Sequence, residues 1–336
     1  MESSYAIIPN MMLQIGDQFD RFQIQGHLAQ GGMSEIYRAY DLVNRREVVL
    51  KLPDPSMIGD PAQYERFQRE IEVVRTLDHP AILKGLDAGR FNRTPFLVTE
   101  LVLGESLRKV IETQTPMSPE QALKLTRKIA DGMSYCHKNN VIHRDLKPEN
   151  ILINPEGQPV IMDFGLALTK SAHRVTYSNL SATMGTPDYM APEQIDGQRG
   201  DARTDIYALG TILFELLAGR VPFSGDSQLA IMAQHMQGTP PRLDKLVPAV
   251  SAQVAAIVAR CLRKNPDERY ADMDALMAAI DHPETADLAL LEEAAKHPLA
   301  AQAWCQSSAF KAVALAFGIL VVLVVLAFAL QFFRPS

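Results

Sequence analysis

Hydrophobic and polar residues alternate along residues 19 to about 50, and a glycine pair interrupts the alternation. Phe22 and Ile24 precede Gly31-Gly32, and the apolar run Val48-Val49-Leu50 closes the stretch. Successive side chains of a strand point to opposite faces of a sheet. This period of two therefore predicts antiparallel strands joined by tight turns.

The spacing changes to that of a helix over residues 61 to 77. Apolar side chains recur there three or four residues apart, at Tyr64, Phe67, Ile71, Val74 and Leu77. Pro61 stands at the expected first turn, where its missing N–H would have no helical partner anyway. Another strand pair is predicted at roughly residues 82 to 101. The first hundred residues therefore predict a small sheet that carries one helix.

Helical patterns dominate from Pro119 onward. The segments with helical spacing are 122–139, 205–218, 228–236, 254–262 and 273–280. A long irregular stretch, 166–193, lies between them, and a loop of that length inside a compact domain is usually functional. Strands followed by helices predict an α+β fold.

Composition supports a folded protein and excludes one class of partner. Hydrophobic residues make up 47% of the 336 residues and charged residues 21%, as in globular domains. The formal net charge is -6 and no basic block is present, so we expect no nucleic-acid partner. The three widely spaced cysteines have no zinc-ligand spacing and are expected to be reduced thiols.

The C-terminal part of the chain is strongly apolar. Residues 312–330 form an uninterrupted run of 19 Ala, Val, Leu, Phe, Ile and Gly residues. At about 1.5 Å per residue, such a helix spans close to the roughly 30 Å hydrocarbon core of a bilayer. We therefore predict a transmembrane helix at 312–333 rather than a buried core helix or a C-terminal docking segment, because core helices keep a polar edge and this run has none.

Two further segments flank the predicted folded part. Residues 1–18 form an N-terminal extension without the basic and apolar regions of a signal peptide. Residues 282–308 form an Ala-rich connector. A short helix within the connector, packed either on the membrane or on the domain, fits this composition.

The glycine pair Gly31-Gly32 lies between two predicted strands, where backbone N–H groups can approach an anion closely. A tight hairpin turn explains the pair equally well. Lys51 ends the next apolar strand, and a half-buried lysine needs an anionic partner, although an exposed lysine at a strand end is also common. Glu70, on the following helix, is the natural partner.

The strongest chemical signal is the run His143-Arg144-Asp145-Leu146-Lys147-Pro148-Glu149-Asn150. This density of charge beside apolar strands is costly unless it is used. Asp145 can accept a proton from an alcohol, Lys147 can neutralise a phosphoryl group, and Asn150 offers a neutral oxygen to Mg²⁺. Asp163, after the next apolar strand, would place a second oxygen ligand beside Asn150 across a hairpin.

These motifs resemble the Hanks-type (eukaryotic-like) protein kinases, and most of all their bacterial membrane-bound branch. The resemblance covers about residues 19–281, and Ala191-Pro192-Glu193, Asp205 and Arg269 follow in the family's order. It implies a bilobal protein-kinase fold, with a small β-rich N-lobe at about 19–103 and a larger helical C-lobe at about 104–281.

The resemblance also implies roles for the transfer residues. Lys51 would hold the α and β phosphates of ATP and pair with Glu70, and Asp145 would be the catalytic base. Asn150 and Asp163 would bind magnesium, with manganese as an alternative.

A second group of residues would serve the acceptor side and the scaffold. Lys147 and Thr186 would steady the acceptor site and point to serine or threonine as the acceptor rather than tyrosine. Glu193 and Arg269 would form a buried ion pair, and Asp205 would anchor the catalytic loop.

The nucleotide would lie against the glycine-rich loop, an apolar adenine slot and the hinge between the lobes. The residues implied there are Leu28, Ala29, Gln30, Gly31, Gly32, Met33, Ser34, Ile36, Val49, Glu100, Val102 and Leu152. The chain departs from the family where Ala29 and Ser34 replace two glycines, which predicts a less flexible loop. Val49 replaces the usual alanine and predicts a narrower adenine slot.

Regulation is predicted from Arg144, which lies beside the catalytic base and requires an anion to offset its charge. Phosphate on the long loop would supply that anion. The candidate acceptors are Thr176, Ser178, Ser181 and Thr183, and we hypothesise autophosphorylation there. Serine and threonine are also simply common in loops.

Together these features predict an ATP- and magnesium-dependent protein serine/threonine kinase, tail-anchored in the inner (cytoplasmic) membrane with its catalytic domain in the cytoplasm. Its expected partners are cytoplasmic protein substrates and the membrane, together with a cognate phosphatase or a membrane sensor. Two alternatives are a catalytically silent scaffold and a small-molecule phosphotransferase. The intact Lys51, Asp145, Asn150 and Asp163 argue against the first, and the segment from Asp163 to Glu193 argues against the second.

Overall fold

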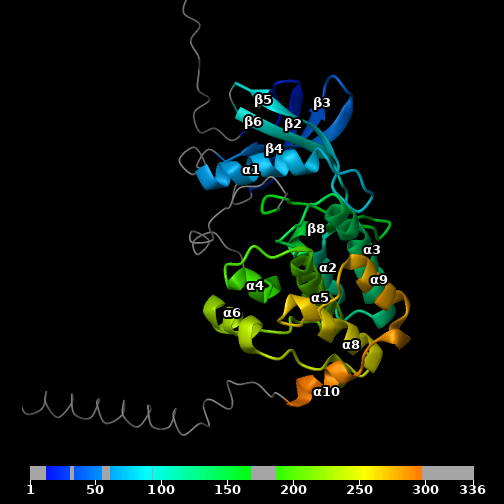
Figure 1. Ribbon diagram of the computed structural model, residues 1–336. Helices are drawn as coiled ribbons and strands as arrows, with labels where there is room; N and C mark the ends of the chain where they lie inside the picture. Colours follow the sequence, from blue (N-terminus) through cyan, green and yellow to red (C-terminus); the bar gives the residue numbers. More distant parts are fainter. Residues whose placement is uncertain (1–12, 31–33, 55–60, 93, 168–186, 297–336) are drawn as a thin grey trace, which may run out of the picture.

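The computed structural model describes residues 13–30, 34–54, 61–92, 94–167 and 187–296. These residues form a β-rich N-terminal lobe and a helical C-terminal lobe, one above the other in Figure 1. The two-lobed α+β architecture expected from the sequence is therefore confirmed. The predicted membrane span at 312–333 and most of the N-terminal extension lie outside the described residues.

The N-terminal lobe is built on an antiparallel sheet with the strand order β1-β2-β3-β4-β6-β5. Its strands are β1 (Gln18–Phe19), β2 (Phe22–Gln30), β3 (Ser34–Asp41), β4 (Arg46–Pro53), β5 (Gly85–Phe91) and β6 (Thr94–Glu100). The predicted alternation places Phe22, Ile24 and Leu50 in the core of this lobe, each at most 1% exposed. The pattern of period two was thus a correct guide to the buried face.

Helix α1 (Pro61–Val74) lies along the sheet (Figure 1). Three of the residues on its predicted apolar face, Phe67, Ile71 and Val74, are buried. The helix ends three residues earlier than predicted, and Leu77 is buried in the turn beyond it. This helix carries Glu70 toward the strand that carries Lys51.

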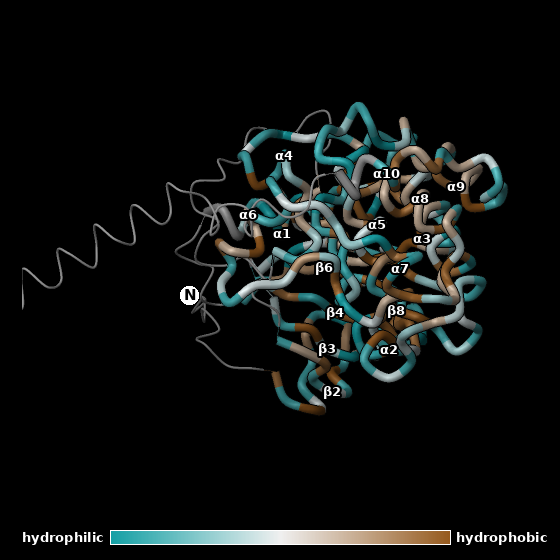
Figure 2. Tube along the Cα trace, turned by 90° about the horizontal axis from the view of Figure 1, so that it is seen from below, coloured by the Kyte–Doolittle hydropathy of each residue, from teal (hydrophilic) through white to brown (hydrophobic). Residues whose placement is uncertain are grey.

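The C-terminal lobe consists of helices around a buried α5 and a small sheet of order β7-β8-β9. The small sheet comprises β7 (Glu105–Ser106), β8 (Ile151–Ile153) and β9 (Pro159–Ile161). The helices are α2 (Leu107–Gln114), α3 (Pro119–Lys138), α4 (Pro192–Ile195), α5 (Ala202–Ala218), α6 (Gln228–Gln237), α7 (Leu243–Leu246), α8 (Ala252–Cys261), α9 (Met273–Asp281) and α10 (Ala289–Lys296). Figure 2 shows hydrophobic segments around α5 and α8, in the interior of this lobe.

Side-chain caps fix where several of these helices begin. The side chains of Ser118, Asp201, Ser227 and Asp272 each accept a hydrogen bond from a backbone N–H in the first turn of α3, α5, α6 and α9, respectively. Such caps satisfy amide groups that the helix itself leaves unpaired. The five predicted helical segments are all present, with ends shifted by a few residues.

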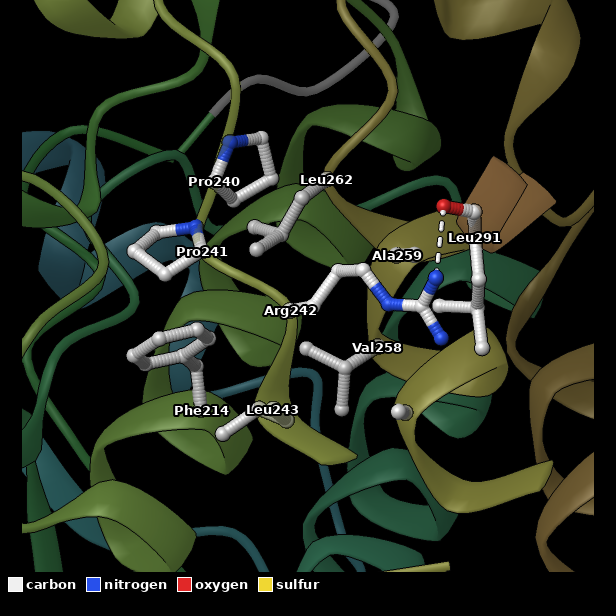
Figure 3. Close-up of a pocket in the computed structure, with 10 residues that line it drawn as sticks. Phe214, Pro240, Pro241, Arg242, Leu243, Val258, Ala259, Leu262 and Leu291 are labelled. Atoms are coloured by element: carbon white, nitrogen blue, oxygen red, sulfur yellow. Dashed lines mark hydrogen bonds between the residues drawn. The ribbon is translucent and has the colours of Figure 1, made fainter. Parts of the chain in front are cut away.

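The position of helix α10 shows whether the helix of the connector packs on the domain or is free to lie on the membrane. Leu291 is 3% exposed and lies near Val258 and Leu262. Figure 3 shows Arg242 reaching toward this helix, where its Nη1 donates to the Leu291 carbonyl at 3.3 Å. The connector helix therefore packs on the domain. Within the part of the chain that the structure describes, no helix is both long enough and apolar enough to cross a bilayer.

Candidate active site

Helix α5 supports the loop that contains the charged run 143–150. The backbone N–H groups of His143 and Arg144 donate to the Asp205 carboxylate at 2.9 and 2.8 Å. Although burial opposes the charge, the neighbouring His137 holds the pKa of the Asp205 carboxyl below its usual value. A buried carboxylate with several donors is a rigid support. Asp205 thus fixes the backbone next to Asp145.

His143 supports the loop from within. Its ring is fully buried, with Nε2 3.1 Å from the Met162 carbonyl oxygen and the ring 4.9 Å from that of Phe164. The contact connects the loop to the segment that carries Asp163. We therefore assign His143 to packing rather than to proton transfer.

Asp145 faces two side chains of its own loop. Its Oδ2 accepts from Lys147 Nζ at 2.7 Å and from Asn150 Nδ2 at 3.1 Å. Burial opposes the charge on Lys147, but Asp145 raises the pKa of that amine above its usual value. The side chains of Asp145 and Lys147 are 30% and 27% exposed, so a substrate can reach both. The structure thus places a carboxylate that can accept a proton, on Asp145, next to the positively charged amine of Lys147.

Lys51 and Glu70 meet between the sheet and α1. Lys51 Nζ lies 2.7 and 2.6 Å from the two Glu70 oxygens. Burial disfavours the charge, yet Glu70 and Asp163 together raise the pKa of Lys51. Burial raises the pKa of Asp163, but Lys51, His143, the Gly165 N–H and Lys147 together lower it below its usual value. Lys51 therefore remains a cation shared between two carboxylates from different lobes.

Asn150 and Asp163 sit at the same end of the β8–β9 hairpin. Ile151 pairs with Ile161 in the register, and the Met162 N–H donates to the Asn150 carbonyl at 2.9 Å. The Asn150 amide nitrogen bonds to Asp145, so its oxygen is directed elsewhere. An ionised carboxylate and an amide oxygen are the hard donors that Mg²⁺ prefers. These residues fit a magnesium ion.

The residues implied for the nucleotide lie on the sheet above this centre. Ile36 pairs with Lys51 across β3 and β4, and Val49 precedes Lys51 by two residues. All three therefore share one face. Ala29 and Gln30 end β2 while Ser34 begins β3, with Ser34 buried and Leu28 exposed. Gly31, Gly32 and Met33 lie outside the described residues.

The residues implied for the hinge and the lower wall lie at the end of β6, in the connection after it and on β8. β6 ends at Glu100, whose N–H donates to the Lys84 carbonyl at 3.1 Å, and Val102 follows in the connection to the C-terminal lobe. Leu152 lies on β8, two residues beyond Asn150. The residues that the resemblance implies for an adenine slot thus come from both lobes.

Glu193 and Arg269 form the buried pair. Arg269 Nη1 and Nη2 each lie 2.7 Å from a different Glu193 oxygen, and the Arg269 side chain is 0% exposed. The pair joins α4 to the residues just before α9. The four candidate acceptors Thr176, Ser178, Ser181 and Thr183, and Thr186 of the implied acceptor site, lie outside the described residues.

One group of residues was missed by the sequence reasoning. Arg108 on α2 bonds to Glu149 of the charged run, and also to Tyr189 and Glu215. Glu149 stood within the quoted run, but nothing in the spacing indicated a partner 41 residues earlier. The eight-residue α2 was itself not predicted.

Comparison with known proteins identifies a family and several relatives of this chain. Residues 22–283 match the family described as protein kinase domain. The serine/threonine-protein kinase PknB of Mycobacterium tuberculosis is 37% identical over 257 residues, which are 75% of this chain and 41% of that protein. The PknB of Mycobacterium leprae is 36% identical over 255 residues, with the same two shares of 75% and 41%.

A third relative is matched over more of its length. The serine/threonine-protein kinase PknL of Mycobacterium tuberculosis is 36% identical over 261 residues, covering 78% of this chain and 65% of PknL. The chain spans about two fifths of the length of the PknB relatives, as the share of 41% shows.

Proposed function

This chain belongs to the protein kinase domain family, and from that premise we propose that it is an ATP-dependent protein serine/threonine kinase. The observation that carries the proposal is the meeting of two groups from different lobes. Lys51 and Glu70 come from the N-terminal lobe, and Asp145, Lys147 and Asn150 from the C-terminal lobe. The charge of Asp163 acts on both Lys51 and Lys147 and so connects the two groups. A catalytically silent scaffold would not require these five side chains to be held by hydrogen bonds.

The proposed reaction transfers the γ-phosphoryl group of ATP to a serine or threonine hydroxyl. A bond forms between the hydroxyl oxygen and the γ-phosphorus, the bond to the β–γ bridging oxygen breaks, and ADP leaves. Asp145 orients the hydroxyl and takes its proton. Lys147, held 2.7 Å from Asp145, offsets the charge on the phosphoryl oxygens. Magnesium, when bound by Asn150 and Asp163, neutralises phosphate charge.

Lys51 orients the other phosphates. Because Glu70 fixes its ammonium group with bonds of 2.7 and 2.6 Å, Lys51 does not need to reorganise when an anion arrives. The pair also requires α1 to lie close to the sheet. The Lys51–Glu70 bonds in the described conformation support this proposed role of Lys51.

We further propose that the enzyme phosphorylates its own loop. Burial lowers the pKa of Arg144 to about 10, with Asp205 opposing the shift and Arg199 and Arg69 adding to it. A position where burial and two other arginines disfavour a cation would be stabilised by a phosphate. Replacing Thr176, Ser178, Ser181 and Thr183 by alanine should sharply reduce peptide phosphorylation, and full activity would refute this part.

Membrane attachment through residues 312–333 is a separate proposal, supported by the 19-residue apolar run. It would place the enzyme at the inner membrane, with the catalytic domain in the cytoplasm among its protein substrates. Val324→Arg should move the protein from the carbonate-resistant membrane fraction to the soluble fraction, because a charge at mid-span is costly. A fraction unchanged by this substitution would contradict the anchor.

The activity itself is tested with labelled ATP and Mg²⁺. The purified full chain should label itself and a generic serine/threonine protein substrate, whereas Asp145→Asn should label neither. Equal lack of label in both proteins would favour the scaffold. Label on small alcohols or amines without label on protein would favour a small-molecule phosphotransferase.

A further inference from the structure

Arg108 joins four elements beside the catalytic loop. Its Nε lies 2.8 Å from a Glu149 oxygen in the loop, and its Nη1 lies 2.8 Å from a Glu215 oxygen on α5. Its Nη2 donates to the hydroxyl of Tyr189, which in turn donates to Glu215. We call Arg108, Glu149, Glu215, Tyr189 and the neighbouring Asp188 the Arg108 cluster.

The cluster holds more negative than positive charge. It contains three carboxylates and one guanidinium, which forms ion pairs with Glu149 and Glu215 and interacts with Asp188 through its charge. The pKa of Asp188 is raised by burial first and then by Glu215 and Glu149, while Arg108 opposes the shift. Burial is also the first cause of the raised pKa of Tyr189, with Glu215 adding to it. Arg108 therefore offsets part of the negative charge of the Arg108 cluster.

The cluster borders the place where a protein substrate must present its hydroxyl. Glu149 follows Asp145 by four residues in the same loop. Burial lowers the pKa of Lys147, and Glu149 helps Asp145 and Asp163 to raise it. Asp188 and Tyr189 follow Thr186, the residue implied for the acceptor site, and are described in the short helix Pro187–Tyr189. A substrate chain that reaches Asp145 therefore passes close to these carboxylates.

Exposure distinguishes the outer part of the cluster from the inner part. Glu149 is 46% exposed and Arg108 25%, whereas Glu215 is only 7% exposed. A substrate side chain can thus reach Glu149 and the edge of the guanidinium. Glu215 is covered and depends on Arg108 and Tyr189 for its hydrogen bonds.

We infer that Arg108 is a specificity-determining residue, which occupies the place on these carboxylates that a basic side chain of the substrate would otherwise take. The inference rests on the proposed kinase function. With Arg108 present, an incoming arginine meets a satisfied acidic group and a nearby like charge. Without it, Glu149 and Glu215 lose a charge-assisted partner, and a substrate cation replaces that partner.

The test measures peptide selectivity. Arginine is placed in turn at each position flanking a serine, and kcat/KM for each peptide is divided by that for the matched alanine peptide. The wild-type ratios should lie near one at every position. In Arg108→Gln the ratio should rise about tenfold at one or two positions, as one or two ion pairs would give. Arg108→Lys should retain the wild-type ratios, because it keeps the charge.

Two further variants separate this effect from loss of structure. Arg108→Gln combined with Glu149→Gln should lose most of the acquired preference. Arg127→Gln removes the remote pair between Arg127 and Asp281 and should leave every ratio unchanged. A ratio is measured on the active molecules alone, so partial unfolding of a variant does not imitate a change in selectivity.

The outcomes keep the two proposals apart. If the wild type phosphorylates no peptide and does not label itself, the proposed function fails. If the wild type is active but Arg108→Gln shows the same ratios, the inference about Arg108 is overturned while the proposed function stands. A strong arginine preference already present in the wild type would also overturn it.

Discussion

The buried pair of Glu193 and Arg269 gives a stability prediction whose size follows from the structure. Arg269→Met removes both 2.7 Å bonds to Glu193 and keeps an unbranched side chain. It also removes the donors to the backbone carbonyls of Arg263, Arg203 and Lys264. The Glu193 carboxylate would keep the Thr204 hydroxyl, at 2.9 Å, as a donor.

Breaking one side of a buried ion pair costs about 3–5 kcal/mol, because the remaining charge stays out of water. For a domain of this size, each kcal/mol lowers the melting temperature by about 2–4 °C. Arg269→Met should therefore melt about 6–20 °C below the wild type. Replacing both residues by methionine should be milder than the single change, because no buried charge is left.

The assay is thermal unfolding of the purified full chain, followed by circular dichroism. Arg127→Met is the matched control, because Arg127 and Asp281 form an exposed pair with side chains 46% and 39% accessible. Exposed pairs contribute about 0–1 kcal/mol. A shift for Arg269→Met no larger than that of the control would refute the reasoning.

Three other changes have definite expected results. Burial lowers the pKa of His235 from 6.5 to about 4, so the folded state holds this side chain neutral while the unfolded chain binds a proton below pH 6.5. The free energy of unfolding should therefore fall as the pH drops from 6.5 toward 4. Urea titrations of His235→Gln should show a weaker fall. Asp163→Asn removes the charge of the proposed magnesium ligand and should lower the transfer rate about a hundredfold or more, measured with labelled ATP at saturating Mg²⁺. Val49→Ala should lower the Michaelis constant for ATP, because it removes two methyl groups from the proposed adenine slot. An unchanged constant would contradict a narrowed slot.

The elements predicted from the sequence were those with strong local patterns. The strands of the N-terminal lobe and the helices near 61–77 and 122–139 have clear alternation or helical spacing, and the structure contains them. Helix α2 was missed because eight residues provide only two turns of pattern, with Leu107, Val110 and Ile111 buried. Too few positions repeat for the period to stand out.

The candidate site was predicted from motifs, and its geometry required the fold. The residue types at Asp145, Lys147 and Asn150 indicated phosphoryl transfer, since few other reactions need that combination so close together. The support from Asp205 spans 62 and 61 residues to its two backbone donors. The Arg108 cluster joins positions up to 107 residues apart. Contacts of that range depend on the packing of helices, which local patterns do not contain.

Helix α10 changes the length of the proposed tether between catalytic domain and membrane. If the chain left the domain at residue 282, then 30 residues (282–311) would separate the domain from the apolar run. Because α10 packs on the domain and ends at Lys296, only 15 residues (297–311) separate them. At most about 3.6 Å per residue, the reach falls from roughly 110 Å to roughly 50 Å. The volume that the active site can search shrinks steeply with that radius, so proteins lying at the membrane surface would meet it at a raised effective concentration. By holding α10 on the domain, the packing of Leu291 would then influence which proteins are phosphorylated.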